Sequence, residues 1–341
     1  MPSSSSKSGK PKPSEVASET KKYYIPLIKQ EHKSRWPTYS YICHQPLASL
    51  IFSDRPADIN PPHFCVFHGD PVDTTIEWQA RYSTPIAFIC AANDRRPGGD
   101  WETGAVGYEE RFCRRSTLAA TLATPAQGSA QADHYPIPIC SGILSPSVVV
   151  FRGPHDKYEK LPLEQWHSIP VVSVPPPRWP KLTQNGTKYS FSDEREMVRD
   201  KLRGALRICA WYRYETVVIG DFGLGNGCRN PPQELAELWR EVLLYDPDLR
   251  GRIRCVVFAF EDPSQNTSQL ILDDIAKKSK SGSSGSGSSS KSKTKSSSSS
   301  STTASNLPTD YQIFLHVFDN REIQRVLGQP DARYGLNNLL A

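Results

Sequence analysis

Two adjacent carboxylates, Glu109 and Glu110, follow shortly after a pair of glycines, Gly98 and Gly99. The whole segment, residues 97–110, is PGGDWETGAVGYEE. One interpretation is structural, because Pro-Gly-Gly is typical of a turn and Glu-Glu is typical of the acidic first turn of a helix. The other is chemical: glycines let backbone N–H groups approach an anionic ligand, and a nearby carboxylate does acid–base work on it.

A second glycine-rich segment, residues 220–232, has the sequence GDFGLGNGCRNPP and contains four glycines. A flexible connector is the plain interpretation. However, the segment follows an apolar run without a polar spacer and leads straight into a helix that begins with proline. Gly223, Gly225 and Gly227 allow the backbone to reach a pyrophosphate. Because the segment is neither a Walker loop nor a Gly-x-Gly-x-x-Gly fingerprint, it indicates a diphosphate site that does not belong to an NTPase.

The elements that must position these loops alternate between strands and helices. Apolar runs predict strands over residues 64–70, 85–92, 145–153, 169–177, 216–222 and 253–262, and helical spacing predicts helices over 72–82, 108–122, 192–212, 231–246 and 310–327. This alternation predicts an α/β fold around a mixed or parallel sheet. In such sheets ligands bind beyond the carboxyl ends of the strands, and both glycine-rich loops begin at such an end, after Ala92 and after Phe222.

The composition indicates one domain with polar additions. Of 341 residues, 37% are hydrophobic, which is low for a globular chain of this length. Residues 1–22 and the Ser/Gly/Lys-rich residues 277–305 account for the deficit. Such segments bury too little apolar surface to offset their ordering entropy, so we expect them to be disordered.

The sequence shows neither the residue spacing typical of a metal site nor an apolar run typical of a membrane-spanning helix. The eight cysteines form no C-x-x-C pair and the eight histidines show no H-x-x-x-H spacing, so we expect no metal and no cofactor. The N-terminus is polar, and no apolar run has the length of a membrane span. We therefore expect an intracellular protein, cytoplasmic or nuclear, with no membrane partner.

Several segments in order resemble the microbial-type poly(ADP-ribose) glycohydrolases, a branch of the macrodomain fold, and this copy is similar to a fungal representative. The segments are residues 93–118, the HYPIP of residues 134–138, residues 145–153 and residues 220–239. The resemblance covers roughly residues 66–262, together with the helix over 311–327. It implies a macrodomain-like three-layer α/β/α sandwich around a mixed sheet.

The resemblance also implies a mechanism. The family's glycine loop and glutamate pair fall on Gly98, Gly99 and Asp100, then Tyr108, Glu109 and Glu110. Asp100 stands where the family has a third glycine, and Tyr108 where it has a glutamine. Glu110 would be the general acid that protonates the leaving ribose oxygen, and Glu109 would hydrogen-bond the ribose hydroxyls. The implied ligand-binding residues are Asn93, Gly98, Gly99, Asp100, Tyr108, Phe222, Gly223, Gly225, Asn226 and Gly227.

The residue types alone leave one point open. Two adjacent carboxylates differ in pKa when one of them is buried, and the sequence does not show whether Glu109 or Glu110 is the buried one.

We expect residues 1–40 to form a disordered tail and residues 41–276 the glycohydrolase domain. We expect residues 277–305 to be a disordered insertion and residues 306–341 to supply a C-terminal helix that completes the domain.

The expected function is hydrolysis of ADP-ribose linkages in poly(ADP-ribose) or ADP-ribosylated protein, without a metal. Two alternatives stay open: a non-catalytic ADP-ribose-binding module, and a hydrolase of a small ADP-ribose derivative. The net charge of +5 comes largely from lysines of the polar segments. This charge favours solubility or a weak attraction of these basic tails to nucleic acid or to poly(ADP-ribose).

Overall fold

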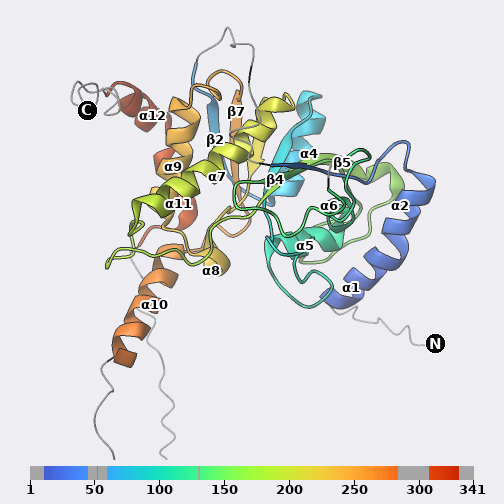
Figure 1. Cartoon of the computed structure of the whole chain (residues 1–341), viewed down its shortest axis with the longest axis horizontal. Helices are drawn as coiled ribbons and strands as arrows, with labels where there is room; N and C mark the ends of the chain where they lie inside the picture. The colour runs from blue at the N-terminus through green and yellow to red at the C-terminus, as the bar shows by residue number, and fades with distance from the viewer. Residues whose placement is uncertain (1–10, 45–51, 53–59, 130, 283–306, 330–341) are drawn as a thin grey trace, which may run out of the picture.

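The computed structural model describes residues 11–44, 52, 60–129, 131–282 and 307–329. Its centre is a seven-stranded mixed sheet in the order β1-β4-β5-β3-β6-β7-β2 (Figure 1). The strands are β1 Tyr41–Cys43, β2 His63–His68, β3 Ala87–Ala91, β4 Gly142–Val150, β5 His167–Val174, β6 Thr216–Ile219 and β7 Cys255–Phe260. Strands β5, β3, β6, β7 and β2 are parallel to one another, whereas β4 is antiparallel to both β5 and β1.

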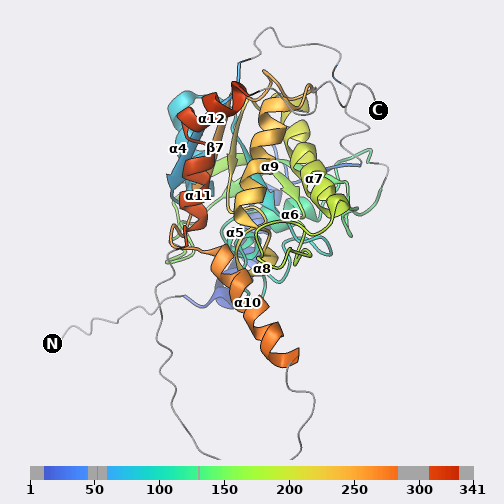
Figure 2. The ribbon, with the colours of Figure 1, turned by 90° about the vertical axis from the view of Figure 1, so that its left-hand side faces the viewer.

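Helices cover both faces of this sheet. They are α1 Pro13–Glu19, the π-helical turn η1 Thr20–Tyr24, α2 Ile25–Glu31, α4 Pro71–Tyr82, α5 Tyr108–Arg115, α6 Leu118–Leu122, the 3-10 turn η2 Leu163–Gln165, α7 Ser192–Trp211, α8 Gly225–Cys228, α9 Pro232–Tyr245, α10 Thr267–Gly282, α11 Asp310–Val317 and α12 Asn320–Leu327. Figure 2 shows α7, α9 and α11 side by side in front of the strands. None of the described helices combines the length and apolar character that crossing a membrane requires.

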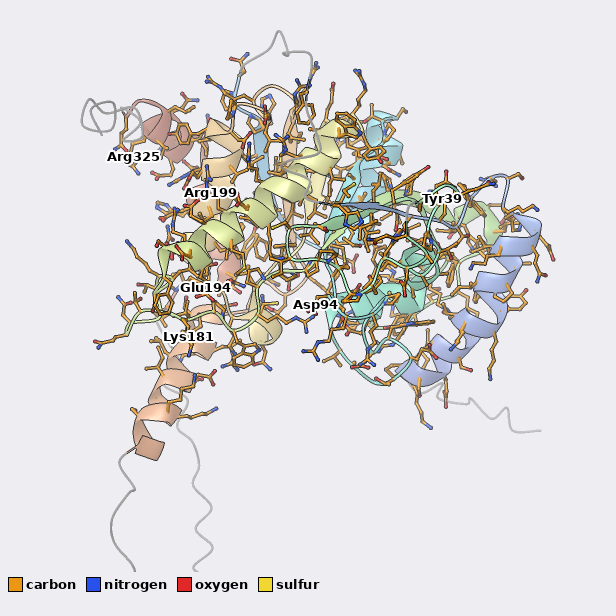
Figure 3. All side chains as sticks on the ribbon, viewed as in Figure 1. Tyr39, Asp94, Lys181, Glu194, Arg199 and Arg325 are labelled. Atoms are coloured by element: carbon orange, nitrogen blue, oxygen red, sulfur yellow. The ribbon has the colours of Figure 1, made fainter. Side chains whose placement is uncertain are left out.

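The alternation of strand side chains explains the two helical layers. In β3, Ala87 and Ile89 pack into the core with α7, α9 and α11, whereas Phe88 and Cys90 pack into the core with α4, α5 and α6. Both faces are apolar because this central parallel strand is buried on both sides. Polar side chains lie outside: Lys181 and Arg325 are exposed, and Figure 3 shows both at the periphery. The predicted three-layer α/β/α sandwich around a mixed sheet is confirmed.

The order β5-β3-β6 decides where the functional loops lie. Register pairs Ala91 with Val174 and Ala87 with Val217, so the three strands end at one edge of the sheet. The first glycine-rich loop leaves β3 at this edge and the second leaves β6 beside it. The sequence-based expectation that both loops begin at strand carboxyl ends is met.

The N-terminal segment differs from the expected tail. Disorder through residue 40 is wrong for residues 13–31, which are helical and pack against the domain. Thr20 Oγ1 donates to the backbone oxygen of Arg114 at 2.6 Å, and the Tyr24 ring stacks on Phe151 with centroids 4.4 Å apart. Ile28 is fully buried. The expectation of disorder was wrong because these helices have a sparse apolar face. The surrounding lysines and serines dominate the composition of the segment, so its composition does not show this face. Residues 1–10 lie outside the described residues.

Two expected helices are interrupted, and the polar insertion begins later than predicted. Ser116 is extended and bridges Val150, so the helix predicted over 108–122 divides into α5 and α6. The helix predicted over 310–327 divides into α11 and α12, because Asp319 caps a new helix by accepting from the Arg321 N–H. Residues 277–282 extend α10, which projects away from the sheet (Figure 1), while the rest of the insertion and residues 330–341 lie outside the described residues.

Candidate active site

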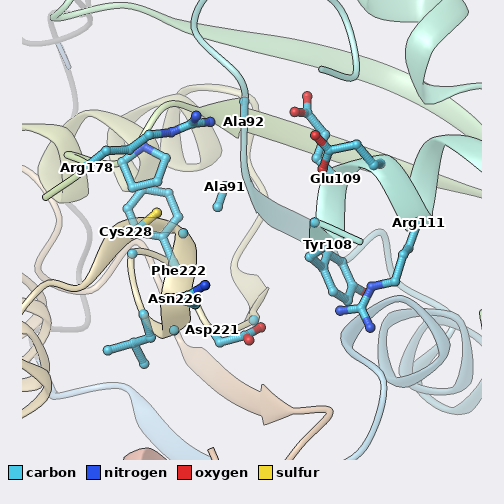
Figure 4. Close-up of a pocket in the computed structure, with 18 of the residues that line it drawn as sticks. Ala91, Ala92, Tyr108, Glu109, Arg111, Arg178, Asp221, Phe222, Asn226 and Cys228 are labelled. Atoms are coloured by element: carbon cyan, nitrogen blue, oxygen red, sulfur yellow. The ribbon is translucent and has the colours of Figure 1, made fainter. Parts of the chain in front are cut away.

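A pocket of about 440 Å³ opens at the edge of the sheet where β3, β5 and β6 end (Figure 4). Its walls come from the start of α5, from the ends of these strands and from the second glycine-rich loop. The lining residues are Phe88, Ile89, Ala91, Ala92, Val106–Arg111, Pro176, Arg178, Gly220–Cys228 and Gln265. Both glutamates and the second loop thus face one cavity.

Glu109 is the buried member of the carboxylate pair, with 4% of its surface exposed. It lies in the first turn of α5, which begins after Gly107. Its Oε2 accepts a hydrogen bond from the Asn93 N–H at 2.7 Å, and its Oε1 has no hydrogen-bond partner among the residues that the structure describes. A buried polar atom without a partner is costly, so this oxygen is suited to a hydroxyl of a bound ligand.

Burial gives Glu109 an unusual protonation state. It raises the pKa of Glu109 to about 8, against the opposing effect of the Asn93 N–H bond and with a further increase from the charge of Glu110. The carboxyl group is therefore mostly neutral at neutral pH. The question that the sequence left open is answered: Glu109 is buried, whereas Glu110 is half-buried.

This pKa predicts how stability depends on pH. Because the pKa of Glu109 lies above its unfolded value of 4.5, folding favours the protonated form, and stability is lost as the pH rises from about 4.5 to about 8. The loss is on the order of a few kcal/mol at most. Glu109→Gln cannot ionise, so in urea unfolding it should match the wild type near about pH 5 and exceed its stability near about pH 9.

The control for this measurement is Glu164→Gln, which alters an exposed glutamate in η2. It should leave the pH dependence of the wild type unchanged. If Glu109→Gln shows the same pH dependence as the wild type, Glu109 is ionised in the folded protein across this range.

The first glycine-rich loop surrounds Glu110. The Asp100 N–H donates to Glu110 Oε1 at 3.4 Å. A Cβ added at Gly99 would overlap Oε1, and one added at Gly107 would overlap Oε2. Gly99 also has a φ of +56°, which favours glycine. These glycines are therefore required to make room for the Glu110 carboxylate itself.

Four expected ligand-binding residues do not line this pocket in the structure. Asn93, Gly98, Gly99 and Asp100 lie behind the two carboxylates and hold them. The Asp100 side chain, half exposed, pairs with Arg96 and not with Glu110. Their direct contact with a ligand stays a prediction, whereas the backbone N–H groups of Asn93 and Asp100 donate hydrogen bonds to the two carboxylates.

Tyr108 lines the pocket, and a hydrogen bond to Asp70 holds its side chain in place. Its hydroxyl donates to Asp70 Oδ1 at 3.3 Å, and Asp70 also caps α4 and pairs with the buried Arg115. The side chain thus ties α5 to the start of α4. This network holds the helix that carries both glutamates.

The second glycine-rich loop is tightly turned. Gly223 and Gly225 have φ values of +78° and +71°, and the Gly225 N–H donates to Thr267 Oγ1 at 2.7 Å. Phe222 is 2% exposed and packs edge-on against Trp239, so it belongs mainly to the core. Asn226 and Gly227 are exposed, and a Cβ at Gly227 would meet nothing within 4 Å. No contact with a described residue therefore requires a glycine at position 227.

Sequence reasoning missed several lining residues. Arg178 follows the three prolines that end β5, and only the pairing of β5 with β3 shows that it lies at the edge where the pocket opens. Arg111 pairs with Glu261 at 2.6 Å beneath the pocket, and burial raises the pKa of Glu261 to about 7 despite this cation. Gln265 comes from the segment before α10, and no sequence motif marks it.

The fold and the site define a class: an α/β/α macrodomain-like domain in which a helix-borne carboxylate pair faces a glycine-rich loop. Residues 18–153 match the family model "Microbial-type PARG, catalytic domain". The matched segment includes Glu109 and Glu110 and begins within α1, in agreement with the packed N-terminal helices. This match agrees with the family resemblance inferred from the sequence over the segment that carries Glu109 and Glu110, and it ends before the second glycine-rich loop.

Solved structures share the fold. The chain is similar to the poly(ADP-ribose) glycohydrolase from Thermomonospora curvata, with 20% identity, a TM-score of 0.58, and coverage of 77% of this chain and 98% of that one. A structure of that enzyme bound to the inhibitor ADP-HPD matches over 78% and 98%, with 20% identity and a TM-score of 0.58. The Deinococcus radiodurans enzyme in complex with ADP-ribose has 21% identity, a TM-score of 0.52, and coverage of 74% and 97%. Among curated proteins no match was found.

Proposed function

We propose that this chain hydrolyses ADP-ribose glycosidic linkages in poly(ADP-ribose) or ADP-ribosylated protein. One observation carries the proposal: a buried, neutral carboxyl, Glu109, presents an unpartnered oxygen beside Glu110 in a pocket whose opposite wall is the second glycine-rich loop. The family match supports it, as do neighbouring structures that hold ADP-ribose and ADP-HPD.

In the proposed reaction Glu110 is the general acid. It protonates the leaving oxygen as the bond from that oxygen to C1″ breaks, which leaves an oxocarbenium-like centre. A water molecule then adds at C1″ and returns a proton to the Glu110 carboxylate, so that the enzyme is restored. Half-burial of Glu110 supports this role, because an acid must exchange protons with solvent between turnovers. No step requires a metal.

Glu109 is proposed as the residue that orients the ribose. Its free Oε1 would hydrogen-bond a ribose hydroxyl, and its Oε2 is anchored by the Asn93 backbone. A group held in one position by the end of β3 fixes the scissile bond relative to Glu110. This division of roles follows the family resemblance.

The proposed diphosphate contact at the second loop gives a direct prediction. Gly227→Ala should weaken binding of ADP-ribose roughly 10-fold, because the added methyl group obstructs the approach of a phosphate to the backbone N–H. Its melting temperature should not change, since a Cβ there meets no protein atom within 4 Å and Gly227 has no positive φ. Calorimetry measures the affinity. Gly153→Ala, away from the pocket and with only ordinary contacts, is the control, and unchanged affinity in Gly227→Ala would contradict the contact.

The substrate class is the finer part of the proposal. Chromatography of products from poly(ADP-ribose), from an ADP-ribosylated protein and from a small soluble ADP-ribose derivative should show free ADP-ribose released from one of the first two. Release only from the soluble derivative would favour the small-molecule hydrolase. We also propose that the partners include ADP-ribosylated proteins. The basic segments would attract nucleic acid weakly, and the protein would be cytoplasmic or nuclear.

A further inference from the structure

Arg178 is a cation in the pocket with no assigned role. It follows Pro175, Pro176 and Pro177, which end β5 at the edge where β3 and β6 also end. Figure 4 shows Arg178 and Glu109 on facing sides of the pocket, with the guanidinium group directed across it. Burial raises the pKa of both Glu109 and Cys228, and the charge of Arg178 is close enough to each group to oppose part of that rise. Arg178 therefore lies between the carboxylate pair and the second glycine-rich loop.

The neighbouring arginines are already paired. Arg111 is paired with Glu261, Arg115 with Asp70 and Asp73, and Arg229 with Asp274. Within the part of the chain that the structure describes, Arg178 has no carboxylate within ion-pair distance, and it is exposed to the pocket. Arg178 thus differs from them as a cation in the pocket that has no ion pair with a carboxylate of the described residues.

The backbone beside Arg178 is fixed to the second loop. The Trp179 N–H donates to the Cys228 backbone oxygen at 2.7 Å, and Trp179 has a φ of +55°, a strained value for a bulky residue. The Arg229 guanidinium lies 4.2 Å from the centre of the Trp179 ring, and Arg229 is itself held by Asn226 and Asp274. Strain of this kind persists only where its surroundings enforce it, and it clusters at ligand-binding sites.

From this arrangement we propose that Arg178 is a ligand-binding residue that neutralises a diphosphate held against residues 223–227 and so selects for diphosphate-bearing ligands. The inference rests on the proposed function, since it takes ADP-ribose as the ligand. A diphosphate is a dianion, and the neutral backbone of the second loop supplies hydrogen bonds without net charge. A guanidinium group matches phosphate oxygens with two parallel N–H donors and is weakly hydrated, so it binds them without a large desolvation cost.

The test compares three variants by calorimetry with ADP-ribose. Arg178→Gln should lose roughly 10- to 100-fold in affinity, and Arg178→Lys should lose less, because lysine keeps the charge without the fork. Arg81→Gln removes the same charge from the exposed end of α4, at the opposite edge of the sheet, and should bind like the wild type. All three should melt at the temperature of the wild type, since Arg178 is exposed.

A second readout separates ligand binding from a merely structural role. Affinity of the wild type should fall as salt rises from about 50 to about 500 mM, and Arg178→Gln should show a clearly weaker salt dependence. In turnover, Arg178→Gln should raise KM and leave kcat nearly unchanged. If Arg178→Gln binds ADP-ribose as tightly as the wild type, with the same salt dependence, the inference is overturned and the proposed function stands. Absence of ADP-ribose binding by the wild type would overturn both.

Discussion

Glu110→Gln should reduce kcat for ADP-ribose release by roughly 10³-fold or more while leaving the affinity for ADP-ribose within a few-fold of the wild type. Glutamine keeps the size of the side chain and can still accept from the Asp100 N–H, but it has no proton to transfer. The loss therefore falls on the chemical step. Turnover assays and calorimetry on the same preparation measure both quantities.

Glu109→Gln is the matched variant. Because Glu109 is mostly neutral at neutral pH, glutamine reproduces much of its hydrogen bonding, and the variant should keep clearly more turnover than Glu110→Gln. The opposite result, with an inactive Glu109→Gln and an active Glu110→Gln, would assign the acid to Glu109.

Gly107→Ala should reduce kcat/KM by roughly 100-fold, although no catalytic group is altered. The new Cβ would overlap Glu110 Oε2, so the carboxylate must move away from its position over the glycines. The backbone at Gly107 has a φ of −58°, which alanine accepts without strain. The effect is therefore expected on activity and not on the melting temperature.

Gly104→Ala is the control for this prediction. It lies in the same loop, and a Cβ there meets nothing within 4 Å. Its activity should equal that of the wild type. If Gly107→Ala is equally active, the carboxylate does not need the space that the glycine provides, and the account of the first loop is wrong.

Periodicity in the sequence predicted the strands β2 to β7 but not the short strand β1. The apolar run at 85–92 became β3, and the run at 216–222 became β6, each with a glycine-rich loop at its carboxyl end. The N-terminal helices could not be predicted in this way, because Ile28 and Tyr24 are embedded among polar residues and become core only in a cluster with Phe151 and Trp166. The composition of a segment is an average over all its residues, so it does not reveal an apolar face formed by only a few of them.

The sequence predicted some of the residues that line the pocket, but it did not predict the electrostatics of the pocket. The sequence shows that Glu109 and Glu110 follow a glycine-rich loop. It does not show that Glu109 is buried, because this burial depends on neighbours at the end of β3. From the sequence we attributed Gly99 to contact with a ligand, whereas in the structure Gly99 and Gly107 make room for the Glu110 carboxylate. Arg178 was missed because a charge after a proline run has no motif until the strand order places it beside the second loop.

The central claim is that this pocket cleaves the glycosidic bond of ADP-ribose polymers. Its most direct test is the release of free ADP-ribose from poly(ADP-ribose) by the wild-type protein, followed by chromatography, with binding of ADP-ribose measured calorimetrically in parallel. We predict catalytic release, with product exceeding enzyme many-fold, together with ADP-ribose binding. Binding without release would contradict the claim and indicate a module that recognises ADP-ribose without cleaving it.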